Sequence, residues 1–127
     1  MLKIQFLRKH CGPEQWAELG QGLKPEAPVG VLIGFEIEGH AGFAEHGQDI
    51  VCAGASALAQ GALLGLQDAL GDKVSFRKQP GYLEVTVGSE TACETAPRAI
   101  LRTLELGFLS IARAYSGHIS VAYQDVD

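Results

Sequence analysis

The chain has 127 residues, 46% of them hydrophobic, and its 10 Lys and Arg against 15 Asp and Glu give a formal net charge of −5. We expect a single domain over residues 1–127, because a chain of this length buries enough surface to fold without a metal or a disulfide framework. The acidic balance argues against direct binding to nucleic acid or to an anionic membrane, and the short apolar runs predict no membrane-spanning segment.

The chain opens with a predicted strand at residues 2–7. Leu2, Ile4 and Phe6 are separated by polar residues, and this period of two is typical of a strand with one buried face. The same start lacks the basic segment and apolar run of a secretory signal, so we expect a cytoplasmic protein.

A second strand is predicted at residues 31–38, VLIGFEIE. The insert between the two strands, about residues 8–30, is rich in Gly and Pro. We expect it to be mostly loop, with a short helix at 13–19. Its large aromatic side chain, Trp16, is expected to pack the insert onto the domain.

A helix is predicted from Asp49 to about Leu70, with Asp49 as its N-cap and Gly71 at its end. Residues 74–87 then contain two alternating runs joined by a Pro-Gly pair. Such a pair between two strand-like runs predicts a β-hairpin.

Residues 94–115 carry the clearest helical pattern, because apolar residues recur there at spacings of three and four. These positions are Ile100, Leu101, Leu104, Phe108, Ile111, Ala112 and Tyr115. Gly117 ends the helix, and the following HISVAYQ predicts a last strand. The order strand, strand, helix, strand, strand, helix, strand indicates an α+β fold of two layers, with both helices on one face of a mainly antiparallel sheet.

The candidate chemistry lies in residues 39–58, GHAGFAEHGQDIVCAGASAL. Cys52 falls in the first turn of a predicted helix, where backbone N–H groups and the helix dipole stabilise a thiolate. His40, upstream at the end of a strand, is a candidate base for it. The residues alone leave a second interpretation open, in which Cys52 is a buried structural cysteine and His40 an ordinary turn residue.

A metal site is the third interpretation, since His40, His46 and Cys52 are borderline-soft ligands. Their spacing lacks the close ligand pair of structural zinc sites, and the plausible completion is His10 with Cys11. We therefore expect no metal and no cofactor.

The cysteine count is odd, with no CxxC pair. Cys11 and Cys93 are expected to be incidental thiols, which leaves Cys52 as the candidate for chemistry.

The same segment resembles the signature of the ribosomal-processing cysteine protease (Prp) family. The matching positions are Gly39-His40-Ala41, Gly47, Asp49 to Ala53 and Ser56. The resemblance implies a bacterial homodimeric endopeptidase that removes the N-terminal extension of large-subunit ribosomal protein number twenty-seven. It implies no cofactor, and the insert at 8–30 departs from the family's pattern.

By position, Cys52 resembles the family's nucleophile and His40 its general base, and Gly39 supports the same motif. Asp49 is either a plain N-cap or a support that lets backbone N–H groups near Cys52 face a developing oxyanion. Ser56 lies on the same helical face as Cys52. Its hydroxyl either reaches the site or bonds back to the Cys52 carbonyl.

The loop before the helix is a candidate substrate loop, with Gly42 and Gly47 bracketing Phe43. We hypothesise that it orders over bound substrate. On the helix itself, a stripe of small residues (Ala57, Gly61 and Gly65) allows close approach to the second helix or to a second copy of the chain.

A function of another class remains as the alternative, namely a non-enzymatic ribosome-assembly or protein-binding module in which Cys52 and His40 are structural. If the chain is a protease, its net charge of −5 predicts that a basic ribosomal protein is steered toward the site.

Overall fold

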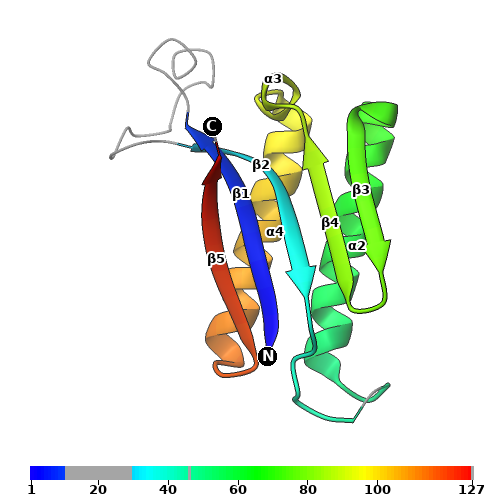
Figure 1. Cartoon of the computed structure of the whole chain (residues 1–127), viewed down its shortest axis with the longest axis vertical. Coiled ribbons are helices and arrows are strands. Elements are labelled where there is room, and N and C mark those ends of the chain that lie inside the picture. Colours follow the sequence, from blue (N-terminus) through cyan, green and yellow to red (C-terminus); the bar gives the residue numbers. More distant parts are fainter. Residues whose placement is uncertain (11–29, 46, 127) are drawn as a thin grey trace.

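The computed structural model describes residues 1–10, 30–45 and 47–126. In chain order the elements are β1 (Leu2–His10), β2 (Gly30–Glu38), α2 (Ile50–Leu70), a 3-10 turn (Gly71–Lys73), β3 (Val74–Gln79), β4 (Tyr82–Val87), α3 (Ser89–Ala92), α4 (Thr95–Ala114) and β5 (Ile119–Val126). In Figure 1 the sheet faces the viewer, and α2 and α4 lie behind it. The described elements therefore form two layers.

The strands form one sheet in the order β3-β4-β2-β1-β5. Neighbouring strands pair antiparallel, except that β5 runs parallel to β1. The predicted α+β class, a mainly antiparallel sheet with two long helices on one face, is confirmed. The sequence does not predict α3, because its four residues are too few for a periodic pattern.

The first two strands are longer than the sequence predicts. β1 continues to His10 and β2 begins at Gly30, and these two residues are register partners. Both ends of the predicted insert at 8–30 therefore belong to the sheet. The remainder, 11–29, lies outside the described residues, together with the predicted helix at 13–19, Trp16 and Cys11.

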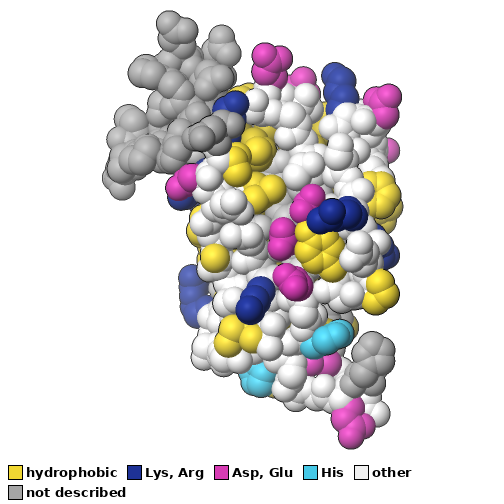
Figure 2. Space-filling view, in the orientation of Figure 1, with side chains coloured by type: hydrophobic (Ala, Val, Ile, Leu, Met, Phe, Trp, Pro, Cys, Tyr) yellow, Lys and Arg dark blue, Asp and Glu magenta, His cyan; other side chains and the backbone are white. Residues whose placement is uncertain are grey.

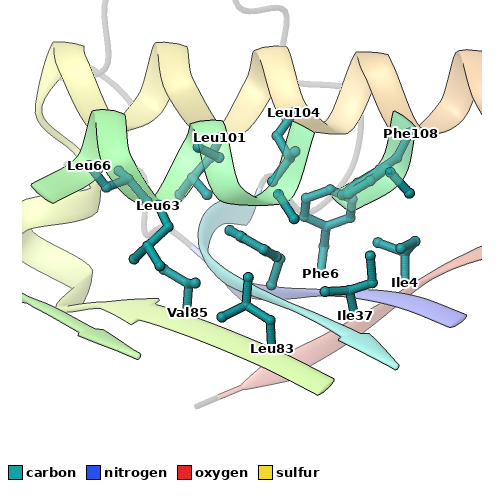
Figure 3. Close-up of a cluster of buried hydrophobic side chains, with 14 of the residues drawn as sticks. Ile4, Phe6, Ile37, Leu63, Leu66, Leu83, Val85, Leu101, Leu104 and Phe108 are labelled. Atoms are coloured by element: carbon teal, nitrogen blue, oxygen red, sulfur yellow. The ribbon is translucent and has the colours of Figure 1, made fainter. Parts of the chain in front are cut away.

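The core lies between the sheet and the two long helices, as Figure 3 shows. The predicted inward face of β1, formed by Leu2, Ile4 and Phe6, is buried, and the Phe6 ring centroid lies 6.1 Å from that of Phe108 on α4. The largest fully buried side chains are Phe6, Phe35, Phe108, Ile4, Leu66, Leu101, Val51, Val85 and Pro97. Because these come from the sheet and from both long helices, the core fixes α2 against the strands.

The small-residue stripe of α2 is divided between two environments. A Cβ added at Gly65 would lie 3.5 Å from Cδ1 of Ile100 on α4, so the helices approach closely there. Ala57 and Gly61 instead line an open apolar groove of about 350 Å³ between the two helices. The predicted close approach to the second helix thus occurs at one end of the stripe.

The other face of the sheet is open and polar. Figure 2 shows acidic side chains gathered in the middle of this face beside basic ones. Glu36 on β2 lies directly opposite Glu84 on β4, and Glu84 accepts a hydrogen bond of 2.8 Å from the Tyr82 hydroxyl. Like charges directly opposite each other oppose strand pairing, so this pair does not stabilise the sheet.

One helical segment, Ile50–Lys73, is long and apolar enough to cross a membrane by length and composition, with a mean hydropathy of 1.5 over its most apolar window. This corrects the expectation that no run of the sequence reaches that length. A third of the window is buried, and the buried residues of α2 pack in the core described above. The apolar composition is thus partly accounted for by packing.

Candidate active site

The candidate site lies where β2 ends and the chain turns through residues 39–49 into α2 (Figure 1). Gly39 has φ +94, a conformation that L side chains rarely adopt, and its N–H donates to the carbonyl of Gly81 at 3.0 Å. A Cβ at Gly39 would stand 2.8 Å from the Met1 carbonyl oxygen. Only glycine fits here, so the loop leaves the sheet at a fixed point beside β1 and the β3–β4 turn.

Asp49 joins the start of α2 to the loop that precedes it. Its Oδ1 accepts from the N–H groups of Val51 and Cys52 at 2.9 and 3.0 Å, as an N-cap does. Its Oδ2 accepts from the N–H groups of Phe43 and Ala44 at 3.0 and 3.4 Å. The hydrogen bond from Cys52 N–H, followed by those from Phe43 and Ala44, lowers the pKa of Asp49 below its usual value against the opposing effect of burial. Asp49 therefore does more than a plain cap.

The same contacts involve the N–H groups that the expected oxyanion role of Asp49 would use. The amides of Val51 and Cys52 are engaged by the Asp49 carboxylate, and that of Ala53 donates to the Asp49 carbonyl at 3.0 Å. These three N–H groups of the helix start are therefore paired with Asp49 in this structure.

Cys52 is half-buried in the first turn of α2, and its Sγ accepts a hydrogen bond of 3.1 Å from the Ala41 N–H. Cys93 is also a half-buried free cysteine, but its Sγ donates to the Ser89 carbonyl at 3.3 Å. The two thiols therefore differ in their hydrogen bonds: the Cys52 sulfur accepts one from a backbone N–H, whereas the Cys93 thiol donates one to a backbone carbonyl. The Cys52 side chain also hydrogen-bonds the Asp49 carboxylate.

His40 and Cys52 face the same space. A cavity of about 540 Å³ lies between α2 and the β3–β4 turn, and a second of about 400 Å³ lies between α2 and the 39–49 loop. His40, Cys52 and Ser56 line both cavities. His40 is exposed, and its Nε2 would be 3.8 Å from a Cβ at Gly81 in the neighbouring turn.

Ser56 is exposed one turn after Cys52. Within the part of the chain that the structure describes, its hydroxyl has no hydrogen-bond partner, so the predicted bond back to the Cys52 carbonyl is not formed. Of the two predicted roles, proximity to the site is the one that the cavity lining favours.

Sequence patterns miss two aromatic neighbours of the loop. Phe43 packs edge-on against Tyr115 and His118, with ring centroids 5.3 Å apart in both cases. The Nδ1 of His118 lies 3.1 Å from the carbonyl oxygen of Ala41. His118 stands at the far end of the sequence from the motif, and nothing in its neighbours marks it as part of a site.

Among residues 1–10, 30–45 and 47–126, no group of three or more His, Cys, Asp or Glu side chains is placed to hold a metal ion. The metal interpretation also involved His46 and Cys11, which lie outside the described residues. What the described residues do bring together is the Cys52 thiol and the His40 imidazole, as lining of the same two cavities.

A family model for the cysteine protease Prp matches residues 26–120. The chain belongs to this family. The resemblance seen in residues 39–58 is thereby confirmed, and so is the predicted class of enzyme, because members of the family are cysteine proteases that hydrolyse peptide bonds.

The ribosomal processing cysteine protease Prp of Bacillus subtilis (strain 168) is 59% identical to this chain over 32 residues. That segment is 25% of this chain and 29% of the B. subtilis protein, so it spans less than a third of the relative.

Solved structures share the fold over the whole length. An essential ribosomal processing protease Prp from S. aureus, in complex with a covalently linked product peptide, superposes with a TM-score of 0.74 at 21% identity, covering 98% of this chain and 100% of the other. SMU.848 from Streptococcus mutans has a TM-score of 0.67, also at 21% identity, covering 99% and 96%.

Proposed function

We propose that this chain is a cysteine endopeptidase that removes the N-terminal extension of large-subunit ribosomal protein number twenty-seven, with Cys52 as nucleophile and His40 as general base. The observation that carries the proposal is the lining of both cavities by His40 and Cys52, with the Ala41 N–H directed at the sulfur. An extended peptide that fills both cavities passes over the thiol, one half on each side of the bond to be cut.

The reaction is an acyl transfer in two halves. His40 takes the thiol proton as Cys52 Sγ attacks the scissile carbonyl carbon, and the carbonyl oxygen becomes an oxyanion. When the C–O double bond re-forms, the C–N bond breaks and the imidazolium gives its proton to the leaving amine, which leaves a thioester on Cys52. Water then attacks the thioester while His40 accepts a proton, the C–S bond breaks, the imidazolium returns the proton to the departing sulfur, and the free acid leaves.

The supporting residues follow from the same geometry. The Ala41 N–H, 3.1 Å from the sulfur, is an amide that can turn from Sγ to the developing oxyanion. Asp49 keeps the loop and the helix start together, and Ser56 lines the path of the peptide. Gly42 and Gly47 line the smaller cavity, which supports a substrate-binding role for the loop that also contains Phe43.

A ribosomal protein as substrate is supported by the relatives and by charge. The B. subtilis relative is a ribosomal processing protease, and the S. aureus protein has been crystallised with a substrate peptide and with a covalently linked product peptide. The net charge of −5 attracts a basic substrate such as a ribosomal protein and disfavours contact with ribosomal RNA. Such a substrate places the enzyme in the bacterial cytoplasm.

The chain is proposed to act as one domain and as a homodimer. Ile50, Leu64 and Leu106 are large apolar side chains exposed on α2 and α4, beside the groove that Ala57 and Gly61 line. A second copy of the chain would cover these side chains.

The test is cleavage of a synthetic peptide that spans the junction of the host's ribosomal protein extension, followed by mass spectrometry. Cys52→Ala removes the proposed nucleophile, and Cys93→Ala is the matched control because Cys93 is the other half-buried thiol among the described residues. We expect one cut by the wild-type chain and by Cys93→Ala, and none by Cys52→Ala. An intact peptide in every reaction, or equal cleavage by Cys52→Ala, would overturn the assignment and favour a non-enzymatic binding module.

A further inference from the structure

His118 has a backbone that is fixed on both sides. Its N–H donates to the Tyr115 carbonyl at 3.1 Å, closing a turn in which Gly117 has φ +90. Its carbonyl accepts from the Leu2 N–H at 3.0 Å. The residue is thus held between the end of α4 and the start of β1, so its side chain projects from a rigid base.

The side chain of His118 reaches the loop that carries the site. Its Nδ1 lies 3.1 Å from the Ala41 carbonyl oxygen, and since a carbonyl only accepts, this hydrogen bond is formed by the imidazole that carries a hydrogen on Nδ1. The N–H of the same residue, Ala41, points at Cys52 Sγ from 3.1 Å. Ala41 is therefore a one-residue bridge between an imidazole donor and the sulfur.

Ala41 and its loop are restrained by other contacts as well. The Ala41 side chain is buried, with 3% of its surface exposed, so it cannot turn outward without leaving the core. Two residues on, Phe43 packs its ring against those of His118 and Tyr115 and donates its N–H to Asp49. His118 thus contacts the loop at Ala41 and Phe43, in addition to the hydrogen bonds that Asp49 accepts from it.

We propose that His118 is a positioning residue for the nucleophile: its Nδ1–H holds the Ala41 carbonyl so that the Ala41 N–H is directed at Cys52 Sγ. The inference rests on the proposed function, in which Cys52 attacks the peptide bond. Without the imidazole donor, the peptide units on either side of Ala41 can rotate. The sulfur then loses the N–H that is directed at it.

The test compares His118→Phe, which keeps a ring against Phe43 but has no N–H, with His118→Asn, whose side-chain amide can donate from near the position of Nδ1. Ser116→Ala, an exposed change in the same turn, is the control. The measurements are the rate of Cys52 alkylation by iodoacetamide at neutral pH, located by peptide mapping, together with kcat and KM for the junction peptide and the thermal midpoint.

We expect His118→Phe to slow Cys52 alkylation and to lower kcat about tenfold, a smaller loss than the 10²–10³ seen when an oxyanion donor is itself removed, because the Ala41 amide remains present. KM should stay within about twofold, since His118 lines neither cavity. His118→Asn should recover most of the rate, and Ser116→Ala should match the wild type.

Equal losses in His118→Phe and His118→Asn would overturn the proposal, as would an unchanged alkylation rate in His118→Phe or a rise in KM alone. Alkylation needs no peptide, so a wild-type chain that fails to cut the junction peptide refutes the proposed function and still leaves the role of His118 measurable. A rise in Cys93 alkylation together with a lower thermal midpoint would mean a general loss of folding, because unfolding exposes this half-buried thiol, and would also overturn the proposal.

Discussion

Replacing Gly39 by Ala tests whether the geometry at the end of β2 sets the activity. The backbone there has φ +94, which costs an L residue about 1–3 kcal/mol. The new Cβ also stands 2.8 Å from the Met1 carbonyl oxygen, and Met1 cannot move freely because the next amide, Leu2 N–H, is bonded to the His118 carbonyl. Losing that bond adds about 1 kcal/mol, so the variant should be roughly 2–4 kcal/mol less stable than the wild type.

At roughly 3–5 °C per kcal/mol for a chain of this length, the thermal midpoint should fall by about 10 °C. His40 is the next residue, so the rate of peptide cleavage should fall at least about tenfold at a temperature where the variant is folded. Gly61→Ala is the control, because Gly61 is an exposed helical position and no described atom lies within 4 Å of the added Cβ. It should gain up to about 1 kcal/mol. A Gly39→Ala variant with an unchanged midpoint would refute the steric argument, and one that loses stability but not rate would refute its link to the site.

Three further predictions concern ionisable groups. Hydrogen bonds, first of all that from the Cys52 N–H, lower the pKa of Asp49, so its carboxylate stabilises the fold above about pH 4. That contribution is lost as the pH falls through the lowered pKa. In urea unfolding, the free energy of unfolding of Asp49→Asn should therefore fall less between pH 7 and pH 3 than that of the wild type. Burial, followed by the hydrogen bond to Glu105, raises the pKa of Tyr123 to about 12. The neutral Tyr123 hydroxyl therefore stabilises the fold fully below pH 10, and this contribution is lost as the pH rises toward 12. In a pH titration, the phenolate absorbance of one tyrosine should appear only as the pH approaches 12, and it should be absent in Tyr123→Phe. Iodoacetamide at neutral pH should modify Cys52 faster than Cys93, and equal rates would contradict the contrast between their hydrogen bonds.

The elements that the sequence predicts well are those whose signal is local. The hairpin 74–87 has two alternating runs and a Pro-Gly turn, and its strands begin and end where predicted. The helix from Ile50 has its N-cap at Asp49 and ends before Gly71, as predicted, because a cap and a stop are each encoded within a few residues.

The features that the sequence does not predict depend on partners far along the chain. The pairing of His10 with Gly30 and the parallel pairing of β5 with β1 are decided by register between distant segments. The same holds for the second pair of bonds to Asp49, from Phe43 and Ala44, because a cap motif indicates the helix but not the loop that folds back on it.

The candidate site likewise combines residues that are close in the sequence with a residue that is distant from them. The motif of residues 39–58 contains the thiol, the imidazole and Asp49, and it is recognised from one short segment of the sequence. The contact to the Ala41 carbonyl comes from His118, and it exists only once β5 lies beside β1. A chain with the whole motif but without a hydrogen-bond donor at the position of His118 should therefore keep the fold and lose much of the rate. The motif alone indicates the proposed nucleophile, whereas the proposed restraint on Ala41 depends on the pairing of β5 with β1.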